Sequence, residues 1–173
     1  MKQSNLDGFD LKLKLKFSEL NTIWKSYCEL HTKLYDLTCD EYVHLLSSDM
    51  DALEETLSMK NDLIELINIS EVSRVSLINE INSLSSNFNI LKISDVINLC
   101  KETNNSNEAL YLEKYNALLL DIIEKIQDQN KLNQLFLNKA ITSLKELKES
   151  FSGRKTYKTY GANGTTSSNS VSR

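Results

Sequence analysis

The fold is decided by residues 18–47, "SELNTIWKSYCELHTKLYDLTCDEYVHLLS". Large apolar side chains recur here every three or four residues, which is the repeat of one face of an α-helix. They are Leu20, Trp24, Tyr27, Leu30, Leu34, Leu37, Tyr42 and Leu45. At 3.6 residues per turn, the stretch predicts an amphipathic helix of roughly eight turns.

A second long helix is predicted from about Asp51 to Leu84. Ser48 or Asp49 is placed to cap its first turn, and the short break at "SSDMD" predicts that it runs antiparallel to the first helix. Its apolar stripe consists of Leu53, Leu57, Ile64, Ile67, Ile78 and Ile81. The charged residues Lys60, Glu71 and Arg74 fall on the same stripe, which indicates a wet or functional section of that face.

The second half of the chain predicts a turn at 87–89, a short helix over 94–102 capped by Ser94, a loop at 103–107 and a third long helix over 107–151. Heptads of the long helix place Asn130 and Asn133 on successive core positions. Two interpretations stay open for this pair. Buried asparagines fix the register of packing, or they form a polar spot in a groove that receives another chain.

The segment "LKLKLKF" at 11–17 alternates like a strand, but no comparable partner strand exists. On a helix, Leu13, Phe17 and Leu20 share one stripe, so we favour a helix; the alternative is an N-terminal arm, residues 1–17, that pairs in a homodimer. The chain has no proline, as expected for long helices. We predict an all-α fold: an elongated antiparallel helical bundle of three long helices plus a short one, forming one domain over 1–152.

Residues 153–173 differ from the rest of the chain. They contain three of the four glycines, and residues 152–173 carry four basic residues and no acid. Since the whole chain has a net charge of −4, this leaves −8 on residues 1–151. The composition predicts a flexible, disordered basic tail. Its Tyr157 and Tyr160 favour a role in binding another protein, because aromatic residues are enriched at interfaces.

Other functional classes lack support in the sequence. No clustered basic surface indicates nucleic-acid binding, and no apolar run reaches the ~18 residues of a membrane span. Cys28, Cys39 and Cys100 are far apart and no signal peptide precedes them, so we expect reduced thiols in a cytoplasmic protein. Cys28 and His31 could both face one metal, but further ligands are missing. No catalytic motif is present, so we predict neither an enzyme nor a cofactor.

Taken in order along the chain, several segments resemble the FlgN-type family of flagellar export chaperones. The residues that carry the resemblance are Asp49, Leu53 and Lys60, then Arg74 and Leu77, then Asn130 and Asn133, and the tail "YGANG" through Tyr160, Gly161, Asn163 and Gly164. The N-terminal "LKLKLKF" has no counterpart in that family's pattern, and the segment 88–107 is polar and matches it poorly.

The resemblance implies a cytoplasmic type III export chaperone. It would bind the hook–filament junction proteins FlgK and FlgL through their terminal amphipathic segments and deliver them to the cytoplasmic domain of the export gate. We expect the substrate groove on the third long helix, at Leu119, Ile123, Ile126, Asn130, Asn133, Leu137, Leu144 and Phe151. We expect docking on the gate at Tyr157, Tyr160, Gly161, Asn163 and Gly164. The alternatives are a chaperone of the filament cap or of flagellin, and a coiled-coil spacer or dimerisation protein.

Overall fold

The computed structural model describes the backbone of residues 2–84, 90, 92–151, 155–160 and 166–171, and the side chains of residues 10–84, 90 and 92–151. The elements are α1 (Lys2–Ser47), α2 (Met50–Leu84), α3 (Ile93–Glu102), α4 (Ser106–Phe151), β1 (Lys155–Tyr160) and β2 (Thr166–Val171). They belong to two units, Met1–Asn130 and Lys131–Arg173. Each unit is described by itself.

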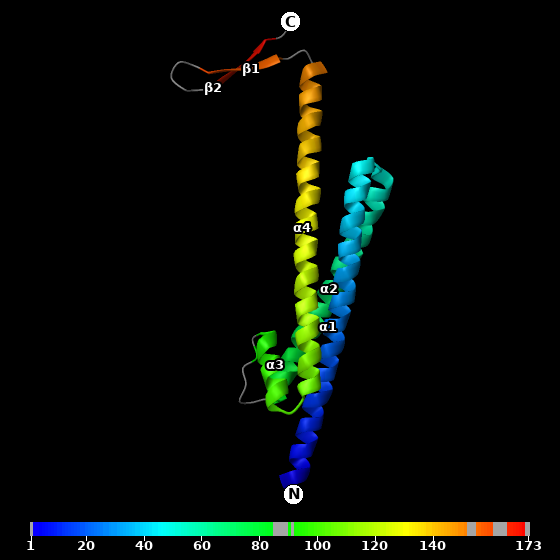
Figure 1. The fold of residues 1–173 in the computed structure, drawn as a ribbon, viewed down its shortest axis with the longest axis vertical. Helices are drawn as coiled ribbons and strands as arrows, with labels where there is room; N and C mark the ends of the chain where they lie inside the picture. Colours follow the sequence, from blue (N-terminus) through cyan, green and yellow to red (C-terminus); the bar gives the residue numbers. More distant parts are fainter. Residues whose placement is uncertain (1, 85–89, 91, 152–154, 161–165, 172–173) are drawn as a thin grey trace. The chain divides into compact units, whose positions relative to one another are not determined.

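The predicted all-α bundle of three long helices and one short helix is confirmed (Figure 1). α1 begins at Lys2, so residues 11–17 are helical and do not form the strand of the alternative interpretation. Leu13, Phe17 and Leu20 are completely buried. The alternation of leucine and lysine therefore places Leu13 inward, while Leu11 and Leu15 face solvent.

The turn between α1 and α2 follows from its sequence. Ser48 has a φ of 56°, the left-handed conformation that often ends a helix. The next backbone N–H, that of Asp49, donates to the carbonyl of His44 at 3.1 Å. The Asp49 carboxylate then accepts from the Ala52 N–H at 3.1 Å, which confirms Asp49 as a cap of α2.

The predicted cap of α3 was wrong. Ser94 lies inside the helix, and the start is closed by Asp95, whose carboxylate accepts from the Lys92 backbone N–H at 2.8 Å. An acidic side chain in the third helical position satisfies the entering backbone better than a serine already within the turn. The turn predicted at 87–89 lies outside the described residues.

The main core of Met1–Asn130 joins all four helices. Leu13, Phe17 and Leu20 of α1 pack with apolar residues of α2, α3 and the first turns of α4. The members contributed by the later elements are Leu77, Ile81, Ile90, Val96, Ile97, Leu99, Cys100, Ala109 and Leu112. Apolar burial of this kind is the main favourable term in folding.

In this unit α2 returns antiparallel to α1, as predicted, and the first part of α4 runs parallel to α1 (Figure 1). Two hydrogen bonds fix the parallel register. The Asn21 side-chain amide donates to the Glu108 carbonyl at 3.2 Å, and the Cys28 thiol donates to the Tyr115 carbonyl at 3.3 Å. The partners advance by seven residues on both helices, so the same faces meet again two turns later.

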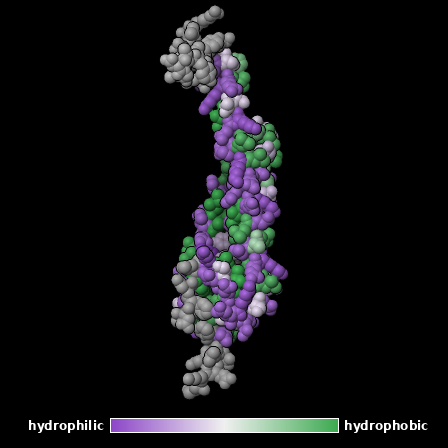
Figure 2. All heavy atoms as spheres, turned by 60° about the vertical axis from the view of Figure 1, so that its left-hand side comes forward, coloured by the Kyte–Doolittle hydropathy of each residue, from purple (hydrophilic) through white to green (hydrophobic). Residues whose placement is uncertain are grey.

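The predicted stripe of α2 is only partly buried. Leu53 and Ile81 are buried and Ile67 and Ile78 half-buried, but Leu57 and Ile64 are exposed, which corrects their assignment to the core. The reason is geometric: the described middle of α2 packs against α1, and a single neighbouring helix covers a narrow face. Figure 2 shows one side of the molecule, on which apolar side chains form patches among polar ones.

The second unit, Lys131–Arg173, contains the last part of α4 and a hairpin. β1 pairs antiparallel with β2, from Lys155 opposite Val171 to Tyr160 opposite Thr166. The sequence had predicted no regular structure here, and the described residues of the tail instead form two paired strands. The predicted helix stop at Gly153 lies outside the described residues, although α4 does end at Phe151.

Candidate partner-binding surfaces

The last turns of α4 expose a continuous apolar stripe. Every residue from 141 to 151 is exposed, including the apolar Ile141, Leu144, Leu147 and Phe151. These four recur at intervals of three or four residues, so they lie on one face of the helix. Leu144 is 65% and Phe151 86% exposed, which is unusual for such large apolar side chains when they are adjacent.

The predicted groove residues fall into two groups. In Met1–Asn130, Ile126 is buried with Cys28, and Leu119 packs against this pair. Ile123 is half-buried and Asn130 is exposed. In Lys131–Arg173, Asn133 is only 2% exposed, Leu137 is half-buried, and Leu144 and Phe151 are exposed. The first part of the predicted groove therefore contributes to internal packing, whereas its end faces solvent.

Sequence reasoning missed Ile122, which is buried beside Ile126 against α1. The signal was present, because Ile122 and Ile126 are four residues apart and share a face with the heptad positions. Thr38, completely buried in α1, was also missed. Its hydroxyl donates to the Leu34 carbonyl at 2.7 Å. This hydrogen bond satisfies the hydroxyl group, so the side chain can be buried.

The charged residues on the stripe of α2 have partners across the α1–α2 pair. The Tyr27 hydroxyl donates to Glu71 at 2.7 Å. Arg74 donates to both oxygens of the same carboxylate, at 2.7 and 2.6 Å. The Arg74 guanidinium also lies 5.9 Å from the centre of the Trp24 ring. The section that the sequence marked as wet is thus a hydrogen-bonded contact between two helices.

These contacts shift the pKa values of the Glu71 carboxyl and the Tyr27 hydroxyl. The hydrogen bonds from Arg74 lower the pKa of Glu71 to about 2, against the opposing effect of burial. Burial raises the pKa of the Tyr27 hydroxyl, and its hydrogen bond to Glu71 raises it further. Around neutral pH the cluster therefore consists of a carboxylate, a guanidinium and a neutral phenol.

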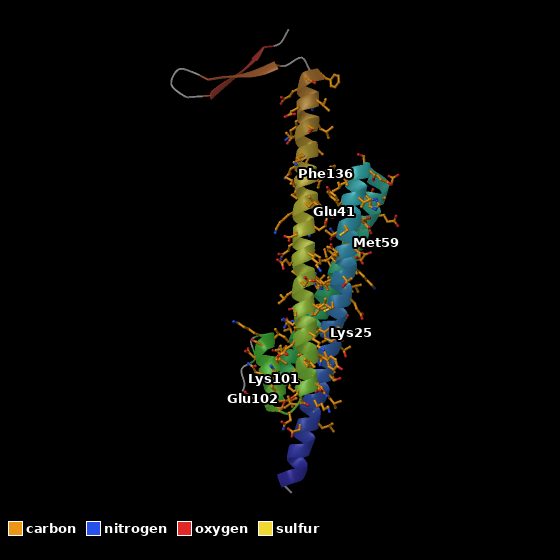
Figure 3. The ribbon with its side chains drawn as sticks, viewed as in Figure 1. Lys25, Glu41, Met59, Lys101, Glu102 and Phe136 are labelled. Carbon is orange, nitrogen blue, oxygen red and sulfur yellow. The ribbon has the colours of Figure 1, made fainter. Side chains whose placement is uncertain are left out.

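A second ion pair lies nearer the turn between α1 and α2, in the region where Figure 3 labels Glu41 and Met59. Lys60 of α2 donates to the Glu41 carboxylate. The two side chains are only 12% and 13% exposed. Each charge stabilises the other, because either one alone would be largely buried and poorly solvated.

Cys28 and His31 do not face a common ligand. The Cys28 thiol is buried and donates to Tyr115, and the His31 Nδ1 lies 2.8 Å from the Tyr27 carbonyl. Burial raises the pKa of Cys28, which keeps the thiol protonated. Among the described residues, no three His, Cys, Asp or Glu side chains gather in a way that could hold a metal ion.

The predicted docking residues of the tail are only partly described. Tyr157 and Tyr160 belong to β1, paired with Asn169 and Thr166, and their side chains are outside the described set. Gly161, Asn163 and Gly164 lie outside the described residues. No described helix contains an apolar stretch of the length that a bilayer span requires.

Comparison with known proteins identifies a family. No curated protein and no solved structure matches the chain. The family model described as "FlgN protein" matches residues 16–168, which covers most of the chain, from the first core turns of α1 into β2. The chain therefore belongs to the FlgN family, a family of flagellar chaperones.

Proposed function

We propose that the chain is a cytoplasmic chaperone that binds the hook–filament junction proteins FlgK and FlgL and delivers them to the flagellar export gate. Family membership supports the broad function. The more specific assignment rests on the resemblance of the asparagine pair and the YGANG tail to the family pattern, together with the surfaces described above.

One observation carries the proposal: the exposed apolar stripe of α4 at Ile141, Leu144, Leu147 and Phe151. A stripe of this spacing is complementary to the apolar face of an amphipathic helix. The terminal segments of the junction proteins are the proposed occupants. Their apolar faces would otherwise associate before export, and covering them needs binding energy but no chemical reaction.

The available binding energy is adequate for reversible capture. Burying a large apolar side chain contributes about 1.5–3 kcal/mol, so four of them give a gross gain on the order of 10 kcal/mol. Association and ordering of the partner remove several kcal/mol of this gain. The remainder corresponds to weak, reversible binding, so further contacts with the partner are needed to reach the micromolar range, about 8 kcal/mol.

The stripe is tested with a matched pair of variants in one helix. The double variant Leu144→Glu, Phe151→Glu changes the stripe, and the control Leu135→Glu changes an exposed leucine on the opposite side of α4. Isothermal titration with purified FlgK and FlgL should give at least about 10-fold weaker binding for the double variant and an unchanged affinity for the control. Equal affinity for the wild type and the double variant would place the substrate site elsewhere.

The tail supplies the proposed contact with the export gate. Its basic residues suit an acidic surface, and tyrosine offers apolar contact area with a polar tip. Tyr160→Ala should weaken binding to the cytoplasmic gate domain and leave substrate affinity unchanged. The two titrations are made on the same variant preparation. Loss of substrate binding with normal gate binding would instead make the tail part of the substrate clamp.

A further inference from the structure

We propose that the N-terminal part of α1 carries a second docking surface, which binds an acidic amphipathic helix of another protein. The surface consists of Leu11, Lys12, Lys14 and Leu15, and we name it the basic leucine patch. The family match begins at residue 16, so the patch lies outside the part of the chain that the family model covers.

The patch belongs to a well-anchored helix. Leu13 and Phe17 on the opposite side of the same turns are completely buried in the main core. Leu11 and Leu15 are nevertheless 60% and 55% exposed. Four residues separate them, so they are neighbours on one helix face. Because the opposite side of these turns is buried in the core, Leu11 and Leu15 are held at the surface.

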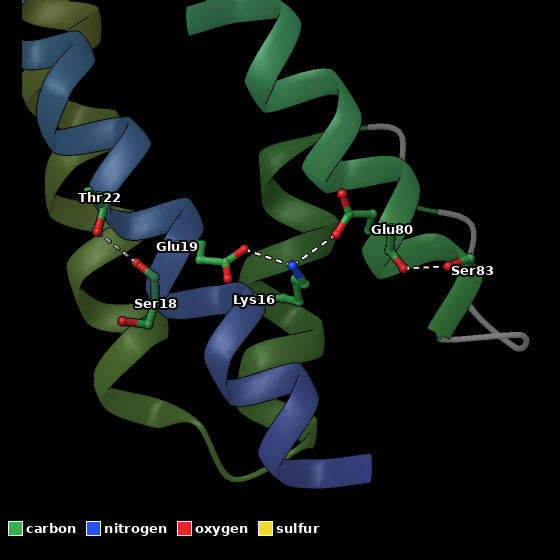
Figure 4. A network of polar contacts seen from close by, with 6 residues as sticks. All are labelled: Lys16, Ser18, Glu19, Thr22, Glu80 and Ser83. Atoms are coloured by element: carbon green, nitrogen blue, oxygen red, sulfur yellow. Dashed lines mark hydrogen bonds and ion pairs between the residues drawn. The ribbon is translucent and has the colours of Figure 1, made fainter. Parts of the chain in front are cut away.

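Among the side chains that the structure describes, Lys12 and Lys14 of the patch have no acidic partner. Neighbouring Lys16 is neutralised by Glu19 and Glu80, each at 2.9 Å (Figure 4). Lys12 and Lys14 are exposed, and no ion pair to either is found among the side chains that the structure describes. They stand on either side of the two leucines, while residues 1–151 as a whole are acidic. A negatively charged partner is therefore attracted to this place on the surface.

The same face of α1 continues into a hollow of about 250 Å³ beside α4. Its lining includes Ser18, Asn21 and Lys25 of α1 and Glu108, Tyr111 and Tyr115 of α4. The Asn21 Oδ1 is buried without a hydrogen-bond partner, so it offers an acceptor to a donor from the occupant. Residues 11, 15, 18 and 25 share one helix face, which gives the site the length of about four helical turns.

A helix fits these observations better than a lipid surface. Beyond Leu15 the same helix face leads to a polar hollow beside α4, which a side chain of a bound peptide helix can enter and a bilayer surface cannot. The occupant should place apolar residues against Leu11 and Leu15 and acidic residues against Lys12 and Lys14.

The test uses two labelled amphipathic peptides of about 18 residues, long enough for some helicity, with identical leucines and either glutamate or lysine on the flanks. Fluorescence anisotropy should show that the full chain binds the acidic peptide at least about fivefold tighter than the basic one. The variant Lys12→Glu, Lys14→Glu should reverse this preference, and Leu11→Gln, Leu15→Gln should weaken binding of both peptides. The control Lys33→Glu, Lys139→Glu has the same change in net charge and should leave the preference intact.

Each other outcome overturns the proposal. All the substituted side chains are exposed, so the thermal midpoints should match the wild type and exclude misfolding. The proposal fails if the Lys12→Glu, Lys14→Glu variant still prefers the acidic peptide. It also fails if the Kd for the acidic peptide is weaker than about 1 mM. Binding to phosphatidylserine vesicles that depends on Lys12 and Lys14, without a peptide preference, would make it a membrane contact. None of these results alters the test of the stripe on α4.

Discussion

The Arg74 guanidinium lies over the Trp24 indole ring at 5.9 Å from its centre. The same group is bidentate to Glu71, which also accepts from Tyr27. One arginine of α2 thus contacts an aromatic pair of α1 and fixes the carboxylate beside it. This explains how a helix can have charges on its inward face and still pack.

Arg74→Ala should lower the free energy of unfolding by about 1–2 kcal/mol, because it removes a cation–π contact and a partly exposed ion pair. The control is Lys25→Ala, whose pair with Glu29 is 3.7 Å long and well exposed; it should cost at most about 0.5 kcal/mol. Urea unfolding measures both values. Equal losses in the two variants would show that the Trp24 contact contributes nothing.

The stability of the fold should fall in acid because of Glu71. Its pKa is about 2 in the folded chain, below the ordinary value of 4.5, so the carboxylate stabilises the fold above pH 4.5. That contribution is lost as the pH falls from about 4.5 toward 2. Glu71→Gln should remove this part of the pH dependence, and a Tm curve identical to that of the wild type between pH 5 and pH 2 would contradict it.

The Glu41–Lys60 pair should show strong coupling. Lys60→Met leaves the Glu41 carboxylate largely buried and unpaired, so it should cost about 3 kcal/mol. The double variant Glu41→Leu, Lys60→Met should recover most of that loss, because two apolar side chains replace two desolvated charges. Additive losses in a double-mutant cycle would show that the two charges act independently.

The three cysteines should differ in reactivity. Burial raises the pKa of Cys100 to about 12 and also raises that of Cys28, so little thiolate is present at pH 8. Cys39 is partly exposed. Brief iodoacetamide treatment followed by peptide mass mapping should find Cys39 alkylated first. Alkylation of Cys100 at the same rate in the folded chain would disprove its burial in the core.

The sequence predicted the helices well because apolar spacing and turn residues report local structure directly. The predicted ends of α2, α3 and α4 agree with the structure within one residue at the described boundaries. The capping contact of Asp95 was not predicted, because serine and aspartate adjoin there and both suit a helix start.

The candidate site was harder to predict. On α4 the same heptad spacing holds Ile126, which is buried, and Leu144, which is exposed. Periodicity identifies the face of a helix, but it does not say whether another helix covers that face. The charges on α2 illustrate the opposite error. The sequence suggested a functional role for Arg74, because its spacing does not reveal that Trp24 and Glu71 are its partners.

The most direct test of the central claim is one set of calorimetric titrations of the full chain with purified FlgK, FlgL, the filament cap protein and flagellin. The account predicts a Kd near the micromolar range, about 8 kcal/mol, for FlgK and FlgL and no measurable heat of binding for the other two. Binding to the cap protein or flagellin, without binding to either junction protein, would contradict it.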